Sequence, residues 1–272
     1  MKKLVVIKYG GHSMSDDTLN QAFAQNIYQA KQNWDIVIGH GGGPQINALL
    51  ENLHIESSFK NGLRITNENT IKAVEMALCG DVNTWLVSLL CQKNILAVGL
   101  TGKDACTIKA QKNADTELGF VGSVTSIDPT LCKLLLNNNY VPIFAPLGYE
   151  EKTGNSLNIN ADTATGALAG SLQAELFILV TDVAGVLDQN KKLLPHLTFA
   201  TINKLKEQQI IYGGMIPKVE SCEHAISQGC KAAFIFDGKN VNKLAQILDE
   251  LSQALSKNDF SSINYGTLIT RG

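Results

Sequence analysis

The chain has 272 residues, of which 44% are hydrophobic and 18% are charged, and its formal net charge is −2. This length and hydrophobic content allow one large α/β core or two lobes that share a sheet, and they exclude a largely disordered chain. The scattered, nearly balanced charges provide no field that would attract DNA or an acidic membrane, so we expect no nucleic-acid and no membrane partner.

Short runs of β-branched and other hydrophobic residues alternate with longer segments that have helical spacing. Strands are predicted at residues 4–9, 35–39, 95–100, 140–146, 175–182, 232–238 and 266–272. Helices are predicted at residues 16–33, 44–53, 68–93, 128–139, 160–172, 198–209 and 215–229. The Asn61-Gly62 pair between two short extended runs indicates a β-hairpin at 55–66, and the polar residues 101–124 favour further hairpins.

The repeated order of strand and helix predicts an α/β fold, with a mainly parallel sheet and helices on both faces. A boundary between two lobes is predicted near residues 173–175, just before the most hydrophobic strand. Ligands of such sheets bind at the carboxyl ends of the strands. The segments that directly follow the strands are therefore the candidate site.

The N-terminus and the cysteines both indicate a soluble cytoplasmic protein. Residues 4–7 are the only hydrophobic run before Lys8, whereas a secretion signal needs roughly 7–15 such residues. No hydrophobic run approaches the roughly 20 residues that span a bilayer. The six cysteines form no C-x-x-C pair, so we expect buried, reduced thiols.

Three consecutive glycines, Gly41 to Gly43, lie between a strand and a helix that has Pro44 near its start. Glycines let backbone N–H groups converge, and the N-terminus of a helix adds positive potential. A tight turn needs fewer glycines, so the pattern favours anion binding. A second glycine motif, GLTGKDA from Gly99, is not a P-loop, because its spacing is too short and Asp104 replaces the required Ser or Thr.

Charged residues accompany these glycines. Lys8 lies at the end of the first strand and needs either an anionic partner or a path to solvent. Asp162 opens a helix, where it could be part of an N-cap, and Lys218 follows two glycines. Cations and N–H groups without a catalytic His, Ser or Cys arrangement fit phosphoryl transfer, which depends on positioning and charge neutralisation.

These motifs resemble those of the N-acetylglutamate kinases, a branch of the amino acid kinase superfamily. The resemblance rests on VIKYGG, HGGGPQI, NGLRIT, GLTGKDA, NINAD, TDVAGVLD and YGGMIPKV, in the order of that family and over nearly the whole chain. It implies a three-layer α/β/α sandwich with an open, mainly parallel eight-stranded sheet. Residues 1–173 would bind the acyl amino acid and dimerise, and residues 174–272 would bind ATP.

The implied reaction is ATP-dependent phosphorylation of the γ-carboxylate of N-acetyl-L-glutamate, the second step of arginine biosynthesis. That carboxylate has a pKa of about 4.3 and needs no general base at neutral pH. Mg²⁺ would arrive with ATP, held mainly by the phosphates. A side chain at the glycine turn would occupy space that the reaction needs.

The resemblance also implies a role for each site residue. Lys8 and Lys218 would stabilise the transferring phosphoryl group, and Asp162 would hold both lysines. The remaining assignments are Gly42, Gly43, Arg64 and Asn158 for N-acetylglutamate, Gly10 and Gly11 for the phosphoryl group, and Asp182, Val183, Ala184, Gly185, Val186, Leu187, Ile210, Ile211 and Tyr212 for ATP.

The resemblance also bears on regulation and on assembly. Arginine-inhibited relatives carry an additional helix before the first strand, which here begins close to Met1, so we expect a homodimer without arginine feedback.

One alternative function is a kinase of a carrier-bound aminoadipate, which the GGGP and NGLRIT motifs oppose. The other is a non-catalytic amino-acid sensor, which would have lost a charged residue among Lys8, Asp162 and Lys218.

Overall fold

The computed structural model describes residues 2–10, 14 and 16–272. In this part of the chain, eight strands form one sheet in the order β12-β14-β13-β11-β1-β2-β8-β5. Neighbouring strands are parallel except β13 and β14. The strands are β1 (Lys3–Tyr9), β2 (Trp34–His40), β5 (Ala97–Thr101), β8 (Val141–Ala145), β11 (Leu176–Thr181), β12 (His196–Thr198), β13 (Ala232–Asp237) and β14 (Thr267–Thr270). The predicted fold class is confirmed.

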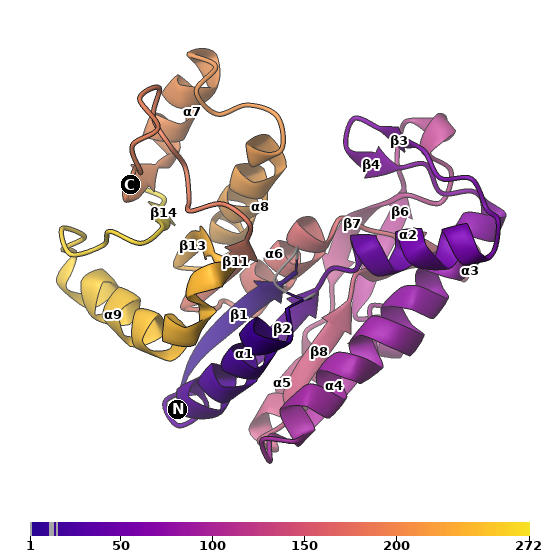
Figure 1. Ribbon diagram of the computed structural model, residues 1–272, viewed down its shortest axis with the longest axis horizontal. Helices are drawn as coiled ribbons and strands as arrows, with labels where there is room; N and C mark the ends of the chain where they lie inside the picture. The colour runs from indigo at the N-terminus through magenta and orange to yellow at the C-terminus, as the bar shows by residue number, and fades with distance from the viewer. Residues whose placement is uncertain (1, 11–13, 15) are drawn as a thin grey trace.

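Helices cover both faces of this sheet (Figure 1). One face carries α1 (Asp17–Ala30), α4 (Thr84–Cys91) and α9 (Leu244–Lys257), and the other carries α5 (Thr130–Asn137), α6 (Ala161–Ser171), α7 (Phe199–Glu207) and α8 (Met215–Ser227). A third hydrophobic cluster lies beneath α2 (Gly43–Asn52) and α3 (Glu68–Glu75). The result is the predicted three-layer sandwich.

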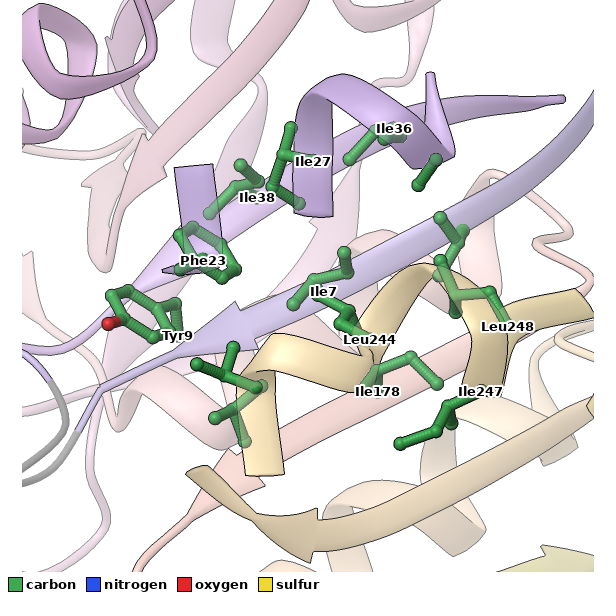
Figure 2. Packing of buried hydrophobic residues seen from close by; sticks show 14 of the residues in the cluster. Ile7, Tyr9, Phe23, Ile27, Ile36, Ile38, Ile178, Leu244, Ile247 and Leu248 are labelled. Atoms are coloured by element: carbon green, nitrogen blue, oxygen red, sulfur yellow. The ribbon is translucent and has the colours of Figure 1, made fainter. Parts of the chain in front are cut away.

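The alternation of side chains along β1 decides which face Lys8 occupies. Val5, Ile7 and Tyr9 pack against α1 and α9, as Figure 2 shows for Ile7 and Tyr9. Val6 belongs to the opposite hydrophobic cluster, with the buried residues of α6 and α8. Lys8 has the same parity as Val6 and therefore projects toward α6, at the carboxyl end of its strand.

The helix predicted at residues 68–93 has an irregular centre. A π-helical segment, Met76–Asn83, joins α3 to α4 without a break. By length and composition alone, residues 68–91 could cross a membrane. Val82, Leu86 and Leu90, however, are buried in the main hydrophobic cluster. The stretch therefore has the character of a core helix.

Two smaller sheets lie beside the glycine turn. Strands β3 (Phe59–Lys60) and β4 (Leu63–Arg64) form the predicted hairpin, and Asn61 and Gly62 between them both have positive φ angles. Such a pair is typical of a type I′ turn. The other sheet has the order β10-β9-β6-β7 and consists of β6 (Ile108–Lys112), β7 (Gly122–Ile127), β9 (Leu147–Glu150) and β10 (Ser156–Asn158).

The sequence prediction missed α9 and the short strands β9, β10 and β12. The helix had a recognisable signal, because Leu244, Ile247, Leu248 and Leu251 follow the i, i+3, i+4, i+7 spacing of an amphipathic helix. All four are buried against the sheet. Strand β12 has only three residues and pairs with β14, so its pattern is too short to identify from sequence.

The close packing of α6 on β2 at Gly39 provides a test of the fold. An added Cβ at Gly39 would lie 2.1 Å from Thr165 Oγ1 and 2.8 Å from Thr165 Cγ2. Gly39→Ala should therefore lower the free energy of unfolding by about 1–3 kcal/mol, measured by urea denaturation. Thr165→Ala should restore part of this loss in the double variant. Gly80→Ala is the matched control, because no atom lies within 4 Å of its added Cβ; an equal loss there would contradict the account.

Candidate active site

A buried carboxylate, Asp162, lies between the two lysines that the sequence singled out. Lys8 Nζ is 3.0 Å from Asp162 Oδ1, and Lys218 Nζ is 3.1 Å from Asp162 Oδ2. Lys218 donates a hydrogen bond, whereas the contact with Lys8 is a charge contact, since Oδ1 accepts no well-aligned hydrogen bond among the described residues. The lysines come from β1 and α8, and the carboxylate from the first turn of α6.

Local structure explains the position of Asp162. Asn160 caps α6, and its side-chain oxygen accepts hydrogen bonds from the backbone N–H groups of Asp162 and Thr163. Burial alone would raise the pKa of Asp162, but the charges of Lys8 and Lys218 outweigh it and hold this pKa below its ordinary value. Asp162 is therefore an anion that fixes two cations in place.

The glycine turn lies beside Lys8. The Gly41 N–H donates to Tyr9 O over 3.1 Å, and a Cβ added at Gly10 would be 2.9 Å from Lys8 Nζ. Helix α2 begins at Gly43 without a side-chain cap, so the N–H groups of its first turn are available to an anion. Gly11, the other predicted phosphate contact, lies outside the described residues.

Packing behind the turn also restricts Gly42. A Cβ at Gly42 would lie 2.6 Å from Leu78 Cδ2 and 3.2 Å from Val82 Cγ2. These side chains belong to the π-helical segment behind the turn. At Gly43 an added Cβ meets no atom within 4 Å. Close packing against this segment therefore disfavours a side chain at Gly42, and the need for space at this turn during the reaction stays a prediction.

A cavity of about 190 Å³ opens in front of the glycine turn. Its lining residues come from the turn, the β3–β4 hairpin and the start of α6: Gly41, Gly42, Gly43, Ile46, Phe59, Gly62, Leu63, Arg64, Leu78, Val121, Pro146, Asn158, Ile159, Asn160 and Ala161. The structure thus gathers all four predicted acceptor residues, Gly42, Gly43, Arg64 and Asn158, around one cavity.

Arg64 is the cation of this cavity. It is buried, its Nη2 donates to Asn47 Oδ1 over 2.6 Å, its Nη1 donates to Ser57 Oγ, and its guanidinium lies 4.6 Å from the centre of the Phe59 ring. Burial lowers the pKa of Arg64 from its ordinary value, and the described residues provide no carboxylate partner for it. Asn158 is held at the other wall by a 3.2 Å hydrogen bond from its Nδ2 to Thr66 Oγ1.

One buried residue near the turn, His40, was not identified from the sequence as functional. Its ring lies between Gly41 O, 2.8 Å from Nδ1, and Asn83 Nδ2, 3.0 Å from Nε2. Burial, with a contribution from the charge of Lys8, lowers the pKa of His40 to about 4. Its position between two glycines at a strand end was the available signal.

The predicted nucleotide residues follow β11 and precede α8. Val183, Leu187 and Tyr212 are exposed, whereas Val186 and Ile211 are buried in the hydrophobic cluster. The side chains of Val186 and Ile211 therefore support the surface from below and cannot themselves contact a nucleotide. Among the described residues, no group of three His, Cys, Asp or Glu side chains could hold a metal ion.

The fold and the two lysines that converge on one carboxylate define a site suited to transfer between two anions. Residues 3–237 match the amino acid kinase family. The chain is 44% identical over 250 residues to an acetylglutamate kinase of Agrobacterium fabrum, covering 87% of this chain and 85% of that protein. It is 45% identical over 251 residues to an acetylglutamate kinase of Bradyrhizobium diazoefficiens, with 88% and 85% covered.

A solved structure agrees in fold. Carbamate kinase from Giardia lamblia bound to AMP-PNP superposes with a TM-score of 0.72 at 20% identity, covering 100% of this chain and 99% of that chain. The chain therefore belongs to the amino acid kinase family, among its acetylglutamate kinases.

The charge of Asp162 predicts a pH-dependent contribution to stability. Because the folded-state pKa of Asp162 is depressed, its contribution is fully present above the unfolded-state pKa of about 3.9 and is lost as the pH falls through the folded-state pKa. Asp162→Asn should cost about 3–5 kcal/mol at pH 7, since it leaves two lysines without their partner. This difference from wild type should shrink below about pH 4.

Urea unfolding at several pH values measures this difference. The control is Glu117→Gln, which removes an exposed ion pair with Lys60 and should cost less than about 1 kcal/mol. A cost for Asp162→Asn that is the same at pH 7 and at acid pH would contradict the proposed charge interaction.

Proposed function

We propose that the protein transfers the γ-phosphoryl group of ATP to the γ-carboxylate of N-acetyl-L-glutamate and so produces N-acetyl-L-glutamyl 5-phosphate, the second step of arginine biosynthesis. The observation that carries this proposal is the bridge from Lys8 through Asp162 to Lys218, next to the uncapped start of α2. The relatives named acetylglutamate kinase support the choice of acceptor. The aminoadipate and sensor alternatives receive no support from them.

The main barrier to this reaction is repulsion between a carboxylate and a polyphosphate. Two unit charges 4 Å apart repel by about 4 kcal/mol at the effective dielectric typical near a protein surface. Lys8 and Lys218 project toward a common point from β1 and α8, so they can neutralise charge on the transferring phosphoryl group. Asp162 keeps both ammonium groups there before the substrates arrive, which avoids reorganisation during the reaction.

The acceptor itself needs no proton removed. A glutamate side chain ionises at about pH 4.3, so the nucleophile is already present near neutral pH. His40 is not placed to act as a base, because its ring is fully buried and both nitrogens are engaged. The residues of the site therefore bind, orient and neutralise charge.

Arg64 is the residue suited to the α-carboxylate of the substrate. Its guanidinium lines the cavity and has five N–H donors. Nη2 donates one hydrogen bond to Asn47, and Nη1 donates one to Ser57. A buried cation without a carboxylate partner is costly, and a bound carboxylate would remove that cost. Asn158, across the cavity, could pair with the acetylamino group.

ATP would lie on the other half of the chain. We infer that residues 174–272 form the nucleotide lobe, with Val183, Leu187 and Tyr212 exposed to the base, and that residues 1–173 form the acceptor lobe. Magnesium held by the phosphates fits this site, because both oxygens of Asp162 already face ammonium groups. The metal would neutralise charge on the phosphates. A cytoplasmic homodimer remains part of the proposal.

Trapping of the acyl phosphate tests this function directly. Purified protein with N-acetyl-L-glutamate, ATP and Mg²⁺ should form a hydroxamate when hydroxylamine is added, and omission of any one of the three should abolish the signal. Carrier-bound aminoadipate should give no product. Absence of product at saturating substrates, or equal turnover of the carrier-bound acceptor, would refute the proposed function.

Kinetics of two variants separate charge neutralisation from acceptor binding. Lys8→Ala should lower kcat by roughly 10²–10³-fold with little change in KM, because its contact strengthens in the transition state. Arg64→Ala should chiefly raise the KM for N-acetyl-L-glutamate. Lys231→Ala, which removes an exposed lysine paired with Glu175, is the control and should match wild type. The reverse pattern for Lys8 and Arg64 would overturn their roles.

A further inference from the structure

The imidazole of His40 has a precise position but no part in the reaction described above. It lies at the carboxyl end of β2, fully buried, between the carbonyl of Gly41 and the side-chain amide of Asn83. Asn83 is 43 residues further along the chain and ends the π-helical segment. A buried polar pair of this kind needs a structural or functional reason.

The neighbours of Asn83 determine which nitrogen of His40 carries the proton. Asn83 Nδ2 lies 3.1 Å from Ile143 O and 3.0 Å from His40 Nε2. Nδ2 also lies 3.4 Å from Leu100 O. Because an amide nitrogen is a donor, the ring nitrogen that faces it at 3.0 Å, Nε2, is unprotonated. The proton of the neutral ring is then on Nδ1, which donates to Gly41 O over 2.8 Å. The low pKa of His40, about 4, agrees with a neutral ring.

This hydrogen bond sets the direction of the peptide between Gly41 and Gly42. In a trans peptide the C=O and the following N–H point in opposite directions, and no peptide bond among the described residues is cis. His40 pairs with Tyr9 and lies on the face of Tyr9, whereas Lys8 lies on the opposite face. With Gly41 O held toward His40, the Gly42 N–H points toward the face of Lys8.

The peptide needs such a restraint because a glycine lies on each side of it. Without Cβ atoms, the two residues can rotate between conformations at little cost. A flipped peptide would turn the Gly41 carbonyl oxygen toward the acceptor carboxylate and remove the Gly42 N–H from it. The loss would fall on the acceptor side alone.

We propose that His40, held by Asn83, is a positioning residue that locks the Gly41–Gly42 peptide with its N–H directed at the acceptor carboxylate. The kinetic consequence of this lock rests on the proposed function. The direction of the Gly41–Gly42 peptide, however, can be tested without an activity measurement. Asn83 is itself held, since its Nδ2 lies 3.1 Å from Ile143 O in β8 and 3.4 Å from Leu100 O in β5. It therefore connects the ends of β2, β5 and β8 to the glycine turn.

Two substitutions separate the two hydrogen bonds of the ring. In His40→Asn the side-chain amide nitrogen can take the place of Nδ1 and donate to Gly41 O. In His40→Gln the amide can reach the place of Nε2 and meet Asn83, but nothing donates to Gly41 O. Both variants are polar and differ by one methylene, so they form a matched pair.

Crystal structures and steady-state kinetics of both variants test the lock. His40→Asn should keep the peptide direction, and its kcat/KM for N-acetyl-L-glutamate should lie within about 3-fold of wild type. His40→Gln should show a flipped or doubly occupied peptide, with kcat/KM for N-acetyl-L-glutamate reduced at least 10-fold and the KM for ATP changed less than 2-fold. Thermal unfolding of both variants separates this effect from a general loss of stability.

Three results would overturn the lock. These are an unchanged Gly41–Gly42 peptide in His40→Gln, equal losses for both variants, or an equal rise of the KM for N-acetyl-L-glutamate and of the KM for ATP in His40→Gln. An inactive wild-type protein would instead refute the proposed function, and the crystal structures would still decide whether His40 sets the peptide direction.

Discussion

Two anions must meet within bonding distance, and the structure addresses this constraint through Asp162. Its two oxygens face ammonium groups that come from distant parts of the chain, Lys8 from β1 and Lys218 from α8. A carboxylate at the centre of a site for anions is unfavourable for the substrates themselves. It is tolerated because it holds two positive charges in place, and its own charge is balanced by them.

Helix α6 makes this arrangement possible, because it contacts the sheet and α8 at very short range. Gly39 lies directly under Thr165, and a Cβ at Gly166 would be 2.9 Å from Ser221 O. At Gly170 an added Cβ would be 2.5 Å from Gln228 Cβ. The small residues of α6 thus bring α8, and with it Lys218, against the helix that begins with Asp162. Packing at one helix therefore determines the spacing of the charges.

The sequence was sufficient for the fold and for the types of residue in the site. Strong periodicity identified most strands and helices, and α9 could also have been found, since Leu244, Ile247, Leu248 and Leu251 have helical spacing. Gly42 shows the limit of such reasoning, because the side chains that exclude a Cβ there, Leu78 and Val82, lie far along the chain. The pairing of His40 with Asn83 depends on tertiary structure in the same way.

The central claim is that Lys8 and Lys218 act on the phosphoryl group during transfer rather than on the bound substrates. The most direct measurement is the affinity for ADP with aluminium fluoride and N-acetyl-L-glutamate, which imitates the transferring group, compared with the affinities for ATP and for N-acetyl-L-glutamate alone. In Lys8→Ala and Lys218→Ala the affinity for the aluminium fluoride complex should fall roughly 100-fold or more. The affinities for ATP and for N-acetyl-L-glutamate alone should fall only a few-fold. Equal weakening of all three affinities would contradict the account.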